Sequence, residues 1–133
     1  MDSDFASPDA VDKLYDLCVK HAIAATWFVE TGSCESWIDR YGSMEGQEIG
    51  LHCYKHRISR KYSQNEHDVR KGKSILKKGG IRPKGYASPF GEWHPSLAKA
   101  VEHHGFTYSS AVSYTHLRAH ETEADLVCRL LLE

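Results

Sequence analysis

Residues 48–56 read Glu-Ile-Gly-Leu-His-Cys-Tyr-Lys-His, a strand-like apolar run that leads into two histidines four positions apart. Neutral imidazole is the commonest protein ligand for zinc, and two imidazoles need only one carboxylate to leave an open, catalytic coordination position. Because the chain holds nine histidines, such a pair can also arise by chance. A zincin-type HEXXH helix does not fit, because Cys53 stands where the glutamate is required. The pair therefore needs a third ligand from elsewhere.

Candidate carboxylates lie at the other end of the sequence, at Asp2 and Asp4. They precede a predicted helix, with Ser7 as its N-cap and Pro8 at its first helical position. Apolar residues at helical spacing give this helix one buried face as far as about Lys20. The residues of that face are Val11, Leu14, Leu17 and Cys18.

A buried strand is predicted at residues 23–29, so the order is carboxylates, helix, strand, polar segment, strand and histidine pair. Alternating strands and helices favour parallel pairing, in which ligands bind at the carboxyl ends of the strands. We therefore expect Asp2 or Asp4 to lie on the same rim as His52 and His56. If residues 2–4 are extended, both carboxylates face the same side.

The remaining sequence predicts further elements of one α/β domain. Residues 31–47 read as a loop with a short helix near 35–38, and residues 65–78 as a helix that ends at Gly79-Gly80. Another helix starts at Pro95 and ends at Gly105, followed by a strand at 106–109. The inward residues of that helix are predicted to be Leu97, Ala98 and Val101.

Four stretches together resemble the polysaccharide deacetylases with a NodB-homology domain, the carbohydrate esterase type. They are Asp4, residues 25–28 (Ala-Thr-Trp-Phe), residues 48–56 and residues 85–93 (Gly-Tyr-Ala-Ser-Pro-Phe-Gly-Glu-Trp). The resemblance covers about residues 1–111. It implies a distorted (β/α) barrel, here partial and truncated, because the family's later strands and late catalytic histidine would lie beyond Ala111.

The resemblance also implies a metal-dependent hydrolase that removes acetyl or similar acyl groups from an amino sugar, a polysaccharide or a glycolipid. Asp4, His52 and His56 match the three metal ligands, and the metal is expected to be Zn²⁺. The common motif has the catalytic base directly before the metal Asp, where this chain has Ser3. Some relatives use Asp-X-Asp, which makes Asp2 the base. A capping or solvent role for Asp2 stays open.

The third motif departs from the family pattern of Arg-X-Pro-Tyr, because residues 87–90 read Ala-Ser-Pro-Phe. The backbone N–H of Phe90 can still help to bind the oxyanion, since a backbone donor does not depend on its side chain. Ala87 leaves the base without its orienting arginine unless Arg82 or Lys84 reaches in.

Two residues of this stretch are expected to contact the substrate. They are Pro89 and Trp93, although for Trp93 aromatic packing is as good an explanation as stacking on a sugar. The alternative function for the whole domain is non-catalytic binding of a sugar or metal on the same fold. Ala87 and the missing late histidine favour that alternative. We expect the chain by itself to be inactive.

Residues 112–133 resemble the translated read-through of a transposase-type sequencing adapter, and we interpret them as a non-native tail. The alternative is a native amphipathic helix, which the leucine spacing would also suggest. Residues 1–111 then form a single partial deacetylase domain.

Composition excludes several classes of partner. The chain has 17 Lys and Arg against 18 Asp and Glu, so nothing in its charge favours nucleic acid. No apolar run approaches membrane-spanning length. A carbohydrate or glycolipid remains the expected partner, and the oligomeric state stays open. Unpaired cysteines and the missing signal peptide favour a cytoplasmic location.

Overall fold

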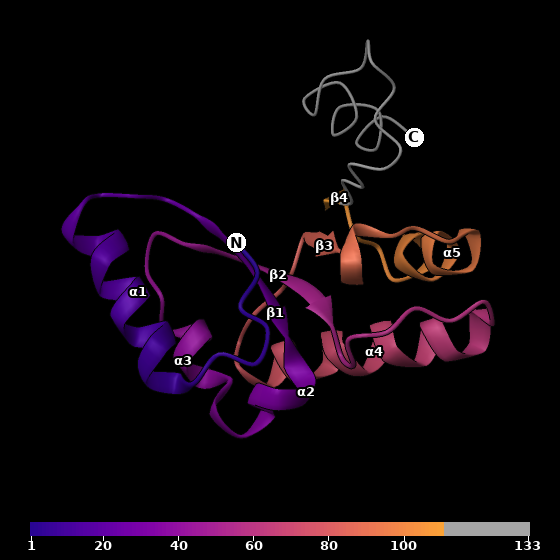
Figure 1. The fold of residues 1–133 in the computed structure, drawn as a ribbon, viewed down its shortest axis with the longest axis horizontal. Helices are drawn as coiled ribbons and strands as arrows, with labels where there is room; N and C mark the ends of the chain where they lie inside the picture. The colour runs from indigo at the N-terminus through magenta and orange to yellow at the C-terminus, as the bar shows by residue number, and fades with distance from the viewer. Residues whose placement is uncertain (111–133) are drawn as a thin grey trace, which may run out of the picture.

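The computed structural model describes residues 1–110, and in them parallel strands alternate with helices, as predicted (Figure 1). Four strands form one sheet in the order β1-β2-β3-β4, and each neighbouring pair is parallel. The predicted tail at 112–133 lies outside the described residues. The elements are α1 (Pro8–Lys20), β1 (Thr26–Glu30), α2 (Thr31–Cys34), η1 (Glu35–Trp37), α3 (Asp39–Gly42), β2 (Glu48–Cys53), α4 (Tyr62–Lys78), β3 (Gly85–Ala87), η2 (Pro89–Gly91), α5 (Pro95–His103) and β4 (Tyr108–Ser110).

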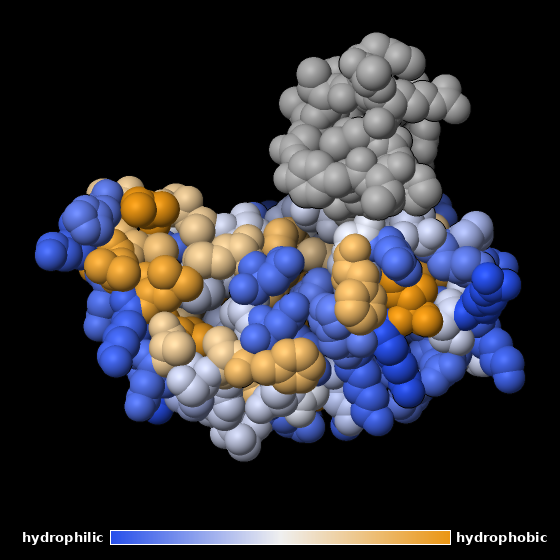
Figure 2. Space-filling model, in the orientation of Figure 1, coloured by the Kyte–Doolittle hydropathy of each residue, from blue (hydrophilic) through white to orange (hydrophobic). Residues whose placement is uncertain are grey.

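Helix α1 begins as predicted, because the side chain of Ser7 accepts a hydrogen bond from the backbone N–H of Ala10 and Pro8 follows the cap. Its buried face is narrower than predicted. Val11 and Cys18 are buried, whereas Leu14 and Leu17 are 38% and 50% exposed. Figure 1 shows α1 at the side of the fold, and apolar colouring gathers over that end in Figure 2. A peripheral helix buries only the stripe that meets its neighbours.

The predicted start of the first strand at Ile23 is wrong, because β1 begins at Thr26. The backbone N–H of Ile23 is bonded to the carbonyl of Cys18 (2.8 Å), and that of Ala22 to the carbonyl of Val19 (3.2 Å). These two bonds and the positive φ of Ala22 (52°) form a Schellman cap. Such a cap is usually recognised in a sequence by a glycine, and this one could not be recognised because the residue is alanine.

The segment between β1 and β2 holds three short helices, α2, η1 and α3, rather than the single one predicted. Helix α4 begins at Tyr62, three residues before the predicted start, and its C-cap is Gly79 as expected. In α5, Ala100 is fully buried and Ala98 is only half-buried, because Ala100 shares a helical face with Leu97 and Val101. Strand β4 starts at Tyr108, later than predicted.

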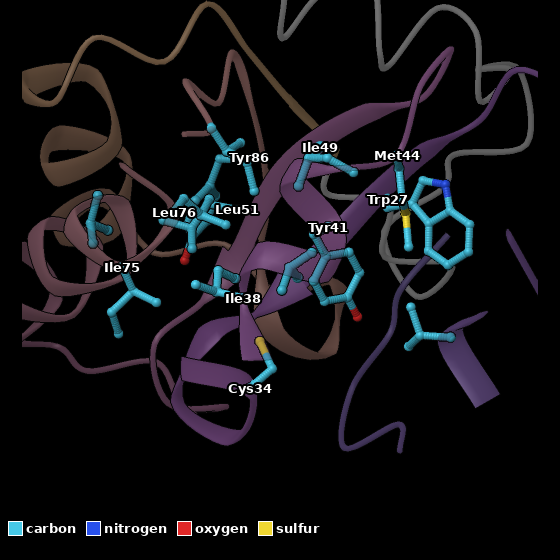
Figure 3. Close-up of a cluster of buried hydrophobic side chains, with 14 of the residues drawn as sticks. Trp27, Cys34, Ile38, Tyr41, Met44, Ile49, Leu51, Ile75, Leu76 and Tyr86 are labelled. Carbon is cyan, nitrogen blue, oxygen red and sulfur yellow. The ribbon is translucent and has the colours of Figure 1, made fainter. Parts of the chain in front are cut away.

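The hydrophobic core lies between one face of the sheet and the helices (Figure 3). Strands β1 and β2 contribute alternate residues to it, and α4 and α5 contribute their apolar faces. Phe28 and Gly50 point to the other face, where the ring of Phe28 leaves no room for a side chain at position 50. The sheet, α4 and α5 supply Trp27, Val29, Ile49, Leu51, Tyr86, Val69, Ile75, Leu76, Leu97, Ala100 and Val101 to the core.

Because all described strands are parallel, the residues that follow β1, β2 and β3 meet at one rim of the sheet. His52 is the residue before the last one of β2 and so lies close to this rim, and the segment after β3 starts at Ser88. Among the described helices, none is long and apolar enough to cross a lipid bilayer.

Candidate metal centre

Asp4 is brought to the rim by a short segment that runs alongside β1. Asp2 forms a parallel bridge with Phe28, in which the backbone N–H of Ser3 donates to the carbonyl of Phe28 (3.1 Å) and that of Phe28 donates to the carbonyl of Met1 (2.8 Å). Asp4 then stands in a turn, closed by a bond from the backbone N–H of Ala6 to the carbonyl of Ser3 (3.3 Å). Residues 2–4 are therefore not all extended, and the condition under which Asp2 and Asp4 would face the same side is not met.

His52 is held by a backbone carbonyl of the neighbouring strand. Its ring is almost fully buried, and its Nδ1 lies 2.8 Å from the carbonyl oxygen of Ala87 in β3. A carbonyl oxygen can only accept, so Nδ1 carries the proton and neutral His52 presents the lone pair of Nε2. This is the tautomer that a metal-binding imidazole requires.

His56 lies in the irregular segment after β2. Hydrogen bonds attach this segment to α4 at two residues, one before and one after Ile58. The guanidinium of Arg57 donates to both carboxylate oxygens of Asp68 in α4 (2.9 and 3.2 Å). The amide of Asn65 accepts from the backbone N–H of Ser59 (2.9 Å) and donates to its carbonyl (2.7 Å). Asn65 and Asp68 are both buried, so α4 fixes the segment that carries His56.

The three side chains converge on one carboxylate oxygen. Oδ2 of Asp4 lies 3.2 Å from Nε2 of His52 and 3.3 Å from Nε2 of His56. One ligand atom from each residue lies within 4.8 Å of the others. In a tetrahedral zinc site with bonds of about 2.0–2.1 Å, ligand atoms are separated by about 3.3–3.4 Å. The spacing therefore suits a zinc-sized ion with little adjustment.

The cluster also contains acceptor atoms that no donor satisfies and that a cation could bind. Oδ1 of Asp4 is buried and has no hydrogen-bond partner in the structure. Nε2 of neutral His52 and a carboxylate oxygen are both acceptors, so their approach is unfavourable without a proton or a metal between them. Two nitrogen donors and one oxygen donor form a set that zinc favours. The residues present therefore fit a divalent metal.

Asp2, the expected catalytic base, is exposed and is not a member of the three-residue cluster. Ser3 takes the position between the two carboxylates. Its hydroxyl accepts a hydrogen bond from the hydroxyl of Tyr41 (2.8 Å) and lies 3.3 Å from the carbonyl oxygen of Phe28. Tyr41 is 1% exposed, and burial raises its pKa to about 12 even though its bond to Ser3 acts in the opposite direction. It therefore stays a neutral donor.

Neither of the two cations expected to replace the arginine missing at Ala87 lies near the cluster. Arg82 and Lys84 both precede β3 and line a cavity of about 360 Å³ with Gln47 and Glu48, which precede β2 or begin it. This cavity lies at the amino ends of the strands. Since the cluster lies at the carboxyl ends, neither cation reaches the position of the missing arginine.

The residues after Ala87 differ in their exposure. Pro89 is fully buried, so its ring packs inside the protein and does not present a surface to a substrate. Phe90 is 68% exposed, and its ring stands edge-on to that of His56 with centroids 4.4 Å apart. Trp93 is partly exposed and packs edge-on against Tyr86. The packing considered for Trp93 is thus present, and its stacking on a sugar stays a prediction.

The cysteines of the described residues are all buried. Cys18, Cys34 and Cys53 are all free and buried, as expected for reduced thiols. Burial, and then the charge of Glu30, raises the pKa of Cys34 to about 12 and raises that of Cys53 as well. Both thiols stay protonated at neutral pH, and neither belongs to the cluster of Asp4, His52 and His56.

Sequence reasoning did not find the residues that hold the ligands in place. They are the carbonyl of Ala87, the hydroxyl pair of Ser3 and Tyr41, and the anchors Asn65 and Asp68. Backbone carbonyls carry no sequence signal, and Tyr41 lies 38 residues from its partner. A buried polar residue within an amphipathic helix, such as Asp68 beside Val69, is the one available hint.

Comparisons with known proteins agree with this geometry. The family model for polysaccharide deacetylases matches residues 2–109. The peptidoglycan deacetylase of Helicobacter pylori is 28% identical over 115 residues, which are 83% of this chain and 39% of that protein. A carbohydrate esterase family 4 pseudoenzyme from Bacillus anthracis superposes with a TM-score of 0.66 at 18% identity, over 77% of this chain and 38% of its own.

A family 4 carbohydrate esterase from Streptomyces lividans, solved in complex with acetate, superposes with a TM-score of 0.65 at 18% identity, over 80% of this chain and 56% of its own. At these identities the solved structures establish the fold alone. This chain spans less than half the length of the Helicobacter and Bacillus relatives.

Proposed function

Since this chain belongs to the polysaccharide deacetylase family, we propose that it carries the metal site of a hydrolase that removes acetyl groups from an amino sugar, a polysaccharide or a glycolipid. The observation that carries the proposal is the contact of one Asp4 oxygen with both Nε2 atoms of His52 and His56. The buried and unpaired second oxygen of Asp4 supports it.

In this proposal Asp4, His52 and His56 would hold zinc, which would lower the pKa of a water molecule to about 7. The carbonyl of Ala87 keeps His52 in the required tautomer. Asp2 is our candidate base, and the backbone N–H of Phe90 our candidate oxyanion donor. Phe90 lies beside His56, which supports its assignment to the rim.

The first experiment is a zinc titration of the purified, chelator-treated chain. We expect one zinc ion per chain, and we expect Asp4→Asn and His52→Ala to weaken binding by at least about tenfold. His67→Ala is the matched control, because His67 is exposed on α4 and is not part of the cluster. Unchanged zinc binding in both ligand variants would show that the assigned metal centre is wrong.

A second candidate function is non-catalytic binding of a sugar or a metal, and Ala87 favours it because it stands where the family has the arginine that orients the base, and neither Arg82 nor Lys84 replaces that arginine. The two candidates differ in how zinc affects the binding of a chitin oligosaccharide. Zinc held by Asp4, His52 and His56 would supply a Lewis acid for the acyl carbonyl, so in a hydrolase zinc should strengthen binding of the oligosaccharide. Equal binding with and without zinc would favour the non-catalytic alternative.

We further propose that this chain by itself releases no measurable acetate, because it spans only 39% of the Helicobacter deacetylase. A missing general acid can cost on the order of 10²–10⁴ in rate. The measurement is acetate release from a chitin oligosaccharide by the zinc-loaded chain. Release that a chelator inhibits and that His52→Ala abolishes would contradict this expectation.

A further inference from the structure

Two turns at the rim have a phenylalanine at a position with positive φ. In the first, the backbone N–H of Ala6 bonds to the carbonyl of Ser3, and the third turn residue is Phe5 with φ 53°. In the second, that of Gly91 bonds to the carbonyl of Ser88 (3.2 Å), and the third residue is Phe90 with φ 59°. This position favours glycine or asparagine, because other side chains are strained at positive φ.

The two phenylalanines also gain little from burial. Phe5 is 69% exposed and Phe90 is 68% exposed. A turn residue that packed into the core could offset its backbone strain, but these rings lie largely in solvent. Neither local conformation nor stability therefore explains why a bulky aromatic ring stands at either position.

Both rings meet at the same metal-ligand candidate. The ring of His56 lies 4.4 Å from that of Phe90 and 6.3 Å from that of Phe5, measured between centroids. Phe5 also directly follows Asp4 in the chain. The imidazole thus has an exposed aromatic ring from each of two separate turns, one before α1 and one after β3.

We infer that Phe5 and Phe90 are two aromatic walls that bind the apolar C–H face of an N-acetylated pyranose and hold it beside the metal centre, and that Phe5 is a specificity-determining residue. The inference rests on the proposed function. Exposed aromatic rings suit this ligand because a sugar ring presents C–H groups on its faces and hydroxyls at its edge. Strain that persists at a functional site is retained for binding rather than for stability.

The test uses the opposite effects that Phe5→Gly should have on stability and on binding. Glycine relieves the positive φ, so the melting temperature should rise by a few degrees. Loss of the ring should weaken the binding of a chitin tetrasaccharide to the zinc-loaded chain by roughly tenfold. Zinc affinity should change by less than about threefold, because the ligands are intact.

Ala22→Gly is the matched control. Ala22 is the remaining non-glycine residue with positive φ among the described residues, and it is exposed at the far end of α1. This variant should raise the melting temperature without changing tetrasaccharide binding. Phe5→Tyr keeps the ring and should bind the tetrasaccharide as the wild type does.

Three outcomes would overturn the inference. One is tetrasaccharide binding by Phe5→Gly equal to that of the wild type. A second is a fall in its melting temperature while Ala22→Gly melts higher, which would make Phe5 a structural support. The third is a wild type that binds zinc but no tetrasaccharide, which would contradict the inference while still supporting the assigned metal centre. A wild type that binds no zinc would contradict the proposed function as well.

Discussion

Asp4 supplies the shared ligand atom, although it stands outside any helix or strand. Its segment is attached to β1 by backbone bonds at Ser3 and Phe28, and one side chain from a distant element reaches it, the hydroxyl of Tyr41. The ring of Tyr41 packs edge-on against Trp27 and stacks on Trp37, so its hydroxyl has little freedom to move. This buried hydroxyl therefore fixes Ser3 and, through Ser3, the turn that presents Asp4.

Tyr41→Phe tests this arrangement because it removes the hydroxyl and keeps the ring. We expect a loss of about 1 kcal/mol in the free energy of unfolding and a threefold to roughly tenfold weaker zinc affinity. Tyr15→Phe is the control, since the hydroxyl of Tyr15 bonds to the backbone of Glu45 and has no contact with the cluster. The measurements are chemical unfolding and zinc titration. An equal effect of both variants on zinc affinity would contradict a positioning role for Tyr41.

At the level of the element, the rim of the sheet holds two candidate ligands in different ways. His52 lies within β2 and is fixed by the adjacent strand, whereas His56 lies in the segment that follows and depends on α4. The carboxylate of Asp68 holds Arg57, the residue next to His56. The geometry at His56 is thus set by a helix that supplies no ligand itself.

Asp68→Asn should weaken this support, because a neutral amide cannot accept both guanidinium bonds. We expect zinc affinity to fall by up to about tenfold, as for other groups that orient a metal ligand. Glu66→Gln is the control on the same helix, since Glu66 pairs with Arg70 and His104 away from the cluster. Zinc titration measures both. Equal zinc affinities for Asp68→Asn and the wild type would show that His56 is positioned without α4.

How far the sequence could predict these elements depended on whether the deciding interaction is local. The start of α1 was predictable because its cap lies within three residues of its partner. The start of β1 was not, because Ala22 adopts the conformation usually reserved for glycine. The candidate ligands Asp4, His52 and His56 were predictable from the resemblance to a known family, whereas their supports were not. Ala87 and Tyr41 act across 35 and 38 residues.

Across the whole molecule, the core and the candidate site occupy different parts of one sheet. The core lies on the helix-covered face, and the candidate metal ligands lie at the rim where the parallel strands end. Because the two regions are separate, none of the candidate ligands has to be placed within the hydrophobic core. The rim in turn retains an unpaired carboxylate oxygen and two strained turns. Several ionisable groups are nevertheless buried in the core, and they link the stability of the whole fold to pH.

The last prediction is that the free energy of unfolding falls at alkaline pH. Burial raises the pKa of Cys34 from 9.0 to about 12 and that of Tyr41 from 10.0 to about 12. Below pH 9 both groups are neutral in the folded and unfolded chain, so their contribution is fully present. Above it the unfolded chain ionises first, and stability is lost until the pH passes about 12. Each group contributes a slope of up to about 1.4 kcal/mol per pH unit.

The measurement is chemical unfolding of the reduced, chelator-treated chain at several values between pH 7 and 11. Cys34→Ala and Tyr41→Phe each remove one of the two groups, so each should flatten the alkaline slope even though it lowers stability at pH 7. The two variants act on different groups, and the double variant should flatten the slope further. A slope that is the same in the wild type and in both single variants would show that these buried groups do not control the alkaline stability of the fold.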